Sequence, residues 1–176
     1  IEAGIVAGVA LSAWRGLGSA AGKIALLAAG FLVGVLFAVY GQVYQTGADP
    51  YGLFVVWGLL IVGWVLIGRQ TGLWMLLLLL VNLSVIFYWT QVLYPQRLGT
   101  EVLGPLVGLT GTFTDARLAD IVFVLNASAL FLWEFLVRRG VSWMRGRIFR
   151  RVVSLLALAP VVFSSLLLVV DFSGTS

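Results

Sequence analysis

The sequence predicts an all-α protein, a polytopic bundle of about six transmembrane helices with no soluble domain. Composition is the first observation behind this prediction. Hydrophobic residues make up 61% of the 176 residues and charged residues 10%, whereas soluble globular domains have about 45–50% and about 25%. The second observation is that the apolar residues form long runs. Such runs indicate helices, because membrane β-strands are about 10 residues long and alternate in polarity.

Six apolar stretches follow one another along the chain. We expect helices over residues 3–14, 24–44, 53–67, 73–94, 118–137 and 152–170. The second stretch contains no charge, and the fourth is rich enough in Leu, Ile, Val and Phe for insertion to be favourable. The first is shorter than the about 20 residues that cross a bilayer. We therefore expect residues 1–176 to be a single helical domain in a fragment that lacks N-terminal helices.

The charges alternate between successive turns. Nine of the eleven basic residues lie in the first, third and fifth turns, and six of the seven acids lie in the other turns or near the ends. Because basic turns stay on the cytoplasmic side, we expect the basic turns in the cytoplasm and both ends of the chain in the periplasm. The net charge of +4 is thus explained by topology, and no nucleic acid partner is expected.

Residue types exclude several kinds of chemistry. The chain has no cysteine and no histidine, which removes thiolate nucleophiles, disulfides, histidine bases and the usual zinc or copper sites. Paired carboxylates and a nucleophile with its base are also missing from the pattern. We therefore expect no cofactor, no metal site and no enzymatic activity.

A polar segment joins the second and third stretches. It contains six polar side chains in a dozen residues, namely Tyr40, Gln42, Tyr44, Gln45, Asp49 and Tyr51. Gly47 suits a helix end and Asp49–Pro50 favours a turn. This segment is a candidate polar site at the outer end of the second and third helices. The alternative is a tight turn whose tyrosines lie at the membrane interface.

Other polar groups lie within or beside the predicted spans. Asn82 and Asn126 are near mid-membrane, where a buried amide needs a partner. They could line a solute path, or pair with each other and fix the register of two helices. Further candidates are two ion pairs along the fifth span, formed by Arg117 with Asp120 and Glu134 with Arg138.

An arginine-rich turn precedes the last stretch. Its basic residues are Arg138, Arg139, Arg145, Arg147, Arg150 and Arg151, with aromatic and aliphatic residues between them. Each basic side chain at a membrane surface contributes about 1 kcal/mol of attraction to anionic lipid. We expect this turn to bind anionic headgroups or to dock a partner protein. Gly4–Gly8 and Gly30–Gly34 are GxxxG patterns that predict close helix packing.

Part of the sequence resembles a known family. The string GQVYQTGADPYGLFVVWGLLIVGWVLIGRQTGLW, from Gly41 to Trp74, is similar to the signature region of bacterial membrane proteins classed as domain of unknown function 2157. The stretch LNASALFLWE, from Leu125 to Glu134, resembles the same family. The resemblance implies a bacterial inner-membrane protein with further hydrophobic spans upstream. It implies no activity, cofactor or catalytic residue.

These observations leave two functional hypotheses. The first is a non-catalytic accessory or scaffold subunit of a membrane complex, with other membrane proteins and lipids as partners. The second is a small-solute or ion transporter that uses the polar segment and the two asparagines. It requires a continuous polar cavity that joins them.

Overall fold

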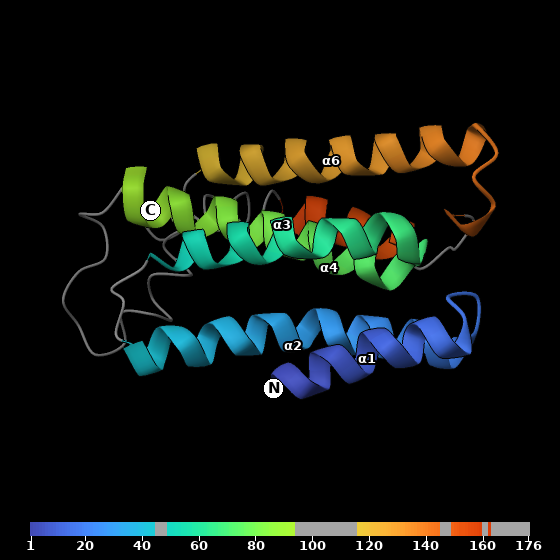
Figure 1. Cartoon of the computed structure of the whole chain (residues 1–176). Helices are drawn as coiled ribbons and strands as arrows, with labels where there is room; N and C mark the ends of the chain where they lie inside the picture. The colour runs from blue at the N-terminus through green and yellow to red at the C-terminus, as the bar shows by residue number, and fades with distance from the viewer. Residues whose placement is uncertain (45–48, 94–115, 145–148, 160–161, 163–176) are drawn as a thin grey trace, which may run out of the picture. The chain divides into compact units, whose positions relative to one another are not determined.

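The computed structural model describes residues 1–44, 49–93, 116–144, 149–159 and 162 (Figure 1). Every regular element within these ranges is a helix, as the sequence predicts. The chain divides into two compact units, Ile1–Ser84 and Val85–Ser176. The organisation as a single domain stays a prediction.

The first unit contains four helices whose bounds follow the apolar stretches closely. They are α1 (Glu2–Arg15), α2 (Ala20–Tyr44), α3 (Pro50–Gly68) and α4 (Thr71–Tyr88), the last of which continues past the boundary of the unit. Asp49 is the N-cap of α3 and Pro50 occupies its first turn, where a missing N–H costs nothing. The helix ends at Gly68, and its C-cap is Arg69, which has a left-handed backbone with φ of 45°.

A core of aliphatic side chains joins three of these helices. Its buried members are Leu26 of α2, Ile61 and Val65 of α3, and Leu73, Leu76 and Leu80 of α4. Val9 of α1 packs against the edge of this core. All four helices of the first unit therefore share one packed interior.

The Gly4–Gly8 pattern brings α1 and α2 close together, as predicted. A Cβ added at Gly8 would lie 3.0 Å from the carbonyl oxygen of Ala25 and 3.0 Å from the Cβ of Ala29. Both α2 residues are buried alanines. Small residues on both helices thus permit a backbone approach that larger side chains would prevent.

The Gly30–Gly34 pattern has a different partner. The indole of Trp57 in α3 covers it, and its Nε1–H donates a hydrogen bond of 2.8 Å to the carbonyl oxygen of Gly30. A Cβ at Gly34 would overlap the six-membered ring of Trp57. The two glycines have no side chain beyond Cα, and the space this leaves is filled by the indole of Trp57.

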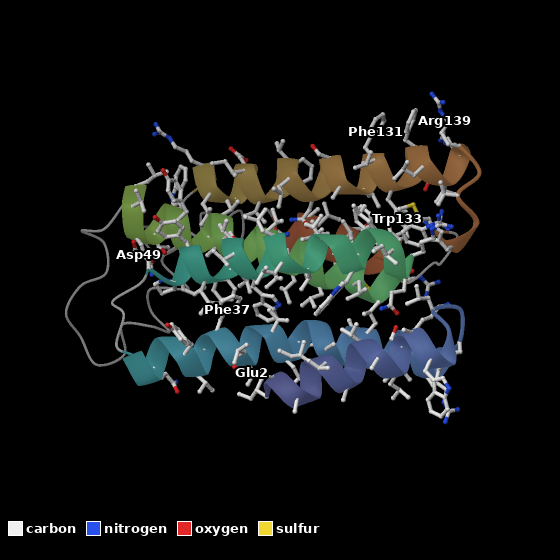
Figure 2. The ribbon with its side chains drawn as sticks, viewed as in Figure 1. Glu2, Phe37, Asp49, Phe131, Trp133 and Arg139 are labelled. Carbon is white, nitrogen blue, oxygen red and sulfur yellow. The ribbon has the colours of Figure 1, made fainter. Side chains whose placement is uncertain are left out.

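The second unit contains α6 (Ala116–Arg138), the π-helical turn η1 (Trp89–Leu93), the short 3-10 helix η3 (Ser142–Met144) and a helix over residues 149–159. An aromatic cluster joins three of them. Trp133 of α6, labelled in Figure 2, stacks on Phe149 with ring centroids 3.7 Å apart and an interplanar angle of 16°. Trp143 of η3 meets Trp133 edge-on, with centroids 5.9 Å apart. This cluster attaches the helix over residues 149–159 to the last turns of α6.

Four of the described helices are long and apolar enough to cross a membrane. They cover Ala20–Gln42, Pro50–Gly68, Thr71–Leu93 and Arg117–Arg138. At most 33% of the residues in any of their crossing windows are buried inside the protein. The side chains that these helices expose are largely apolar. Such helices are stable in the hydrocarbon core of a membrane.

The first and last predicted stretches differ from these four. The 14 residues of α1 are fewer than a crossing needs, as the sequence predicts. The last stretch is described over residues 149–159 and at residue 162, and its remainder, which includes Pro160, lies outside the described residues.

Candidate functional site

The predicted polar segment lies where α2 ends and α3 begins. Tyr40, Gln42 and Asp49 are exposed, and Tyr51 is half-buried. The carbonyl oxygen of Asp49 accepts a 3.0 Å hydrogen bond from the N–H of Gly52, while its carboxylate makes no capping bond. The side chain of Tyr44 and the whole of Gln45 lie outside the described residues. The polar site at this turn stays a prediction.

The two predicted membrane amides are both buried. Nδ2 of Asn82 donates a 2.8 Å hydrogen bond to the carbonyl oxygen of Leu78, one turn back in α4. Asn126 is 0% exposed, and its Nδ2 donates to the carbonyl oxygen of Val122 at 2.8 Å. Each amide thus bonds to its own helix, which lowers the cost of burying a polar group in hydrocarbon. Their mutual pairing stays a prediction.

The ion pair at the end of α6 differs from the predicted one. Oε2 of Glu134 lies 3.7 Å from Nη1 of Arg150 in the following helix, and not beside Arg138 as the i,i+4 spacing predicts. The stack of Trp133 on Phe149 explains why Glu134 pairs with Arg150. Glu134 follows Trp133 and Arg150 follows Phe149 in the sequence, so the stack brings the two charged residues together. Sequence spacing within one helix could not reveal this partner. The predicted pair of Arg117 with Asp120 stays a prediction.

Replacing Glu134 with Gln is expected to lower the free energy of unfolding by less than about 1 kcal/mol. The two side chains are 38% and 46% exposed, so water screens their attraction. Denaturant unfolding in detergent, at low and high salt, measures the effect. A double-mutant cycle with Arg150→Gln isolates the pair. A coupling above about 2 kcal/mol would contradict an ion pair of the surface type.

Basic residues gather at one end of the first unit, as the alternation of charges predicts. The turn between α3 and α4 lies against the first part of α2, where the backbone of Gly68 approaches the side chain of Leu26. The turn between α1 and α2 lies at this same end of α2. The two turns therefore place three exposed basic residues at one end of the unit, namely Arg15, Lys23 and Arg69.

The arginine-rich turn is described in part. Arg138, Arg139, Arg150 and Arg151 are exposed, whereas Arg145 and Arg147 lie outside the described residues. The guanidinium of Arg139 lies over the ring of Phe135, 4.8 Å from its centroid, and this contact restricts the side chain. The exposed guanidinium groups suit an anionic partner.

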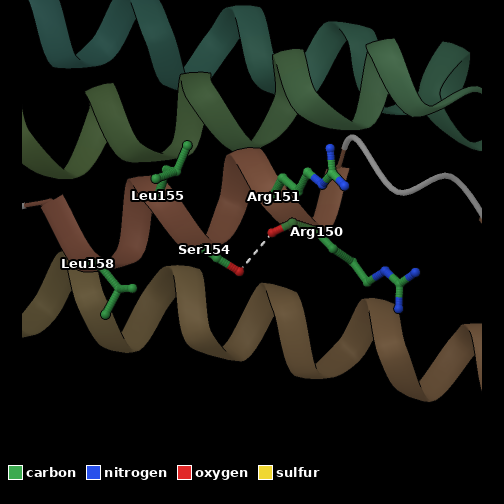
Figure 3. A pocket seen from close by; sticks show the side chains of 5 residues that line it. All are labelled: Arg150, Arg151, Ser154, Leu155 and Leu158. Carbon is green, nitrogen blue, oxygen red and sulfur yellow. Dashed lines mark hydrogen bonds between the residues drawn. The ribbon is translucent and has the colours of Figure 1, made fainter.

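An open groove of about 740 Å³ runs along the helix over residues 149–159 (Figure 3). Arg150, Arg151, Ser154, Leu155 and Leu158 line it. The arginines are predicted from the sequence, whereas the groove is not. A signal was present, because residues 151, 154, 155 and 158 have the i, i+3, i+4, i+7 spacing of one helix face.

The described residues offer no obvious reaction centre. Within those ranges no three histidine, cysteine, aspartate or glutamate side chains lie close enough to share a metal ion. The buried polar side chains there are Ser12, Gln70, Asn82 and Asn126, all uncharged.

Comparison with known proteins adds one finding. Residues 3–74 match the family described as "Predicted membrane protein (DUF2157)". The chain is a membrane protein with transmembrane helices. The family match begins in α1 and ends in α4, so it includes the polar segment and most of the first unit. It confirms the resemblance seen in Gly41 to Trp74. The similar stretch from Leu125 to Glu134 lies outside the matched residues. No curated protein and no solved structure matches the chain.

Proposed function

We propose that this chain is a non-catalytic accessory or scaffold subunit of a complex in the bacterial inner membrane. The observation that supports it most is the placement of charge. In the part of the chain that the structure describes, every charged side chain is exposed or half-buried. Membrane transporters and proton relays usually keep ionisable groups inside the bundle. A subunit that binds through its surfaces does not require them.

The orientation belongs to the same proposal. Arg15, Lys23 and Arg69 at one end of the first unit, together with the arginine-rich turn, favour a cytoplasmic location for these basic turns. Both ends of the chain then lie in the periplasm. The partners would be other membrane proteins and anionic lipids, with no nucleic acid and no cofactor.

A small-solute or ion transporter is the second candidate. The two buried amides, Asn82 and Asn126, favour it, because polar side chains in membrane helices often mark solute paths. It requires a polar cavity that joins them to Gln42 and Asp49. We prefer the scaffold, because no charged side chain of the described residues is buried.

The scaffold predicts a stable complex. After mild detergent extraction from native membranes, light scattering on a sizing column should give a protein mass above that of one polypeptide, which denaturing mass spectrometry of the same sample measures. Joint replacement of Arg138 and Arg139 with Gln should release the partner, because both guanidinium groups are exposed. Arg15→Gln, an exposed basic residue of the first unit, is the matched control. A strictly monomeric chain with no co-purifying protein would contradict the proposal.

A further inference from the structure

One face of the helix over residues 149–159 is amphiphilic along its length. Two guanidinium groups, of Arg150 and Arg151, lie at one end of the groove, and the side chains of Leu155 and Leu158 line it further along (Figure 3). The seven residues from Arg151 to Leu158 correspond to about 10 Å of helix. Charge at one end and hydrocarbon along the rest match the two parts of a lipid.

The charged end has capacity for an anion. Among the described residues, Arg150 has one acidic neighbour, Glu134, at the long separation of 3.7 Å. Arg151 has no ion-pair or hydrogen-bond partner among the described residues and is exposed. Two guanidinium groups and one carboxylate leave a net positive charge at this end. A phosphodiester can accept hydrogen bonds from both guanidinium groups at once.

The remainder of the groove is apolar. The hydroxyl of Ser154 donates its hydrogen bond to the carbonyl oxygen of Arg150, at 2.7 Å, and so is satisfied within the helix. Leu155 is 69% exposed and Leu158 is 52% exposed. An occupant of this part gains contact with leucine side chains and loses no hydrogen bond to it. An acyl chain meets that description, and a soluble anion does not.

We propose that this groove binds one anionic phospholipid, with its phosphodiester at Arg150 and Arg151 and an acyl chain along Leu155 and Leu158. The site differs from general attraction of lipid to a basic surface, because one helix places two neighbouring guanidinium groups beside two leucine side chains in a single groove. It requires only that the helix lies in a membrane, and so it does not depend on the scaffold role.

The experiment titrates phosphatidylglycerol into the delipidated full chain in a neutral detergent. Native mass spectrometry reports the fraction of protein with one bound lipid. Arg151→Gln is expected to lower the apparent affinity roughly fivefold, which corresponds to about 1 kcal/mol for one basic side chain. The control is Arg15→Gln, which removes an exposed arginine of the first unit outside the groove and should change the affinity by less than about twofold.

A second pair of variants tests the apolar wall. Joint replacement of Leu155 and Leu158 with Ala should weaken binding, whereas Leu156→Ala, on the same helix but outside the groove, should not. Circular dichroism verifies that each variant keeps its helical content.

Two further ligands, tested on the unmodified chain, separate the possible sources of the phosphate. Phosphatidylcholine with the same acyl chains should bind roughly fivefold more weakly, because it has no net charge. Inorganic phosphate should not displace the bound lipid. Equal affinity for the two lipids, displacement by phosphate, or an equal effect of Arg15→Gln and Arg151→Gln would overturn the proposal.

Discussion

Replacing Trp133 with Ala is expected to lower the free energy of unfolding of the second unit by about 3–5 kcal/mol. The side chain is 2% exposed, and its indole lies between the rings of Phe149 and Trp143. Removing it leaves a cavity where three elements meet. We expect the helix over residues 149–159 to separate from α6, since the stack of Trp133 on Phe149 joins them.

Denaturant unfolding in detergent measures the loss, and limited trypsin digestion locates it. Cleavage after Arg150 and Arg151 should become faster in the variant. Phe131→Ala is the matched control, because that aromatic side chain is on the same helix and is 76% exposed (Figure 2). Its replacement should change the stability of the folded protein by at most about 0.5 kcal/mol.

A conservative variant separates packing from hydrogen bonding. The Nε1–H of Trp133 is buried and has no acceptor among the described residues. Trp133→Phe therefore keeps much of the ring contact and loses no hydrogen bond, so it should cost less than about 1.5 kcal/mol. A loss as large as that of the alanine variant would show that the indole N–H is essential, and would contradict a cluster stabilised by packing.

The second large effect is expected at Gly34. Replacing it with Ala should destabilise the first unit by about 1–3 kcal/mol, because the added methyl group would overlap the ring of Trp57. That ring is also fixed by its hydrogen bond to Gly30. Relief would require α3 to shift away from α2, and this shift would also disturb the shared aliphatic core.

Thermal unfolding in detergent, with matched variants, tests this expectation. Gly41→Ala on the same helix is the control, because its added Cβ would meet no atom within 4 Å. In a Trp57→Ala background, Gly34→Ala should become nearly neutral, which a double-mutant cycle would record as a strong coupling. If Gly34→Ala and Gly41→Ala had the same effect on the unfolding temperature, the indole of Trp57 would not pack against Gly34, and the prediction would be wrong.

Much of the fold can be predicted from local sequence. The long apolar stretches predict α2, α3, α4 and α6 to within a few residues, because in a bilayer each backbone polar group must bond within its own segment. The turn expected at Asp49–Pro50 is where α3 begins, three residues before the expected start at residue 53, because proline suits the first turn of a helix. Alternating charge predicts that Arg15, Lys23 and Arg69 share one end of the first unit.

The candidate site could be predicted only in part. Asn82 and Asn126 are buried as expected, because their positions within long apolar stretches already place them in the bundle. The groove was not predicted, because it depends on which face of the last helix remains uncovered. Likewise, the sequence predicts Arg138 as the ion-pair partner of Glu134, because the two are four residues apart on one helix. Only the packing of Trp133 on Phe149 brings Arg150 close to Glu134 instead.

The sequence by itself therefore determined that this chain crosses a membrane as helices, where those helices lie to within a few residues, and which of their turns are basic. Only the tertiary structure decided what each helix face touches. Gly30 and Gly34 indicate a close approach, but nothing in the sequence says that the approaching group is Trp57. The physical reason is that these helices are apolar on every side, so the pattern of apolar residues does not show which side packs against another helix. Their rotation is set by shape complementarity between side chains of different helices, which is a property of the folded protein.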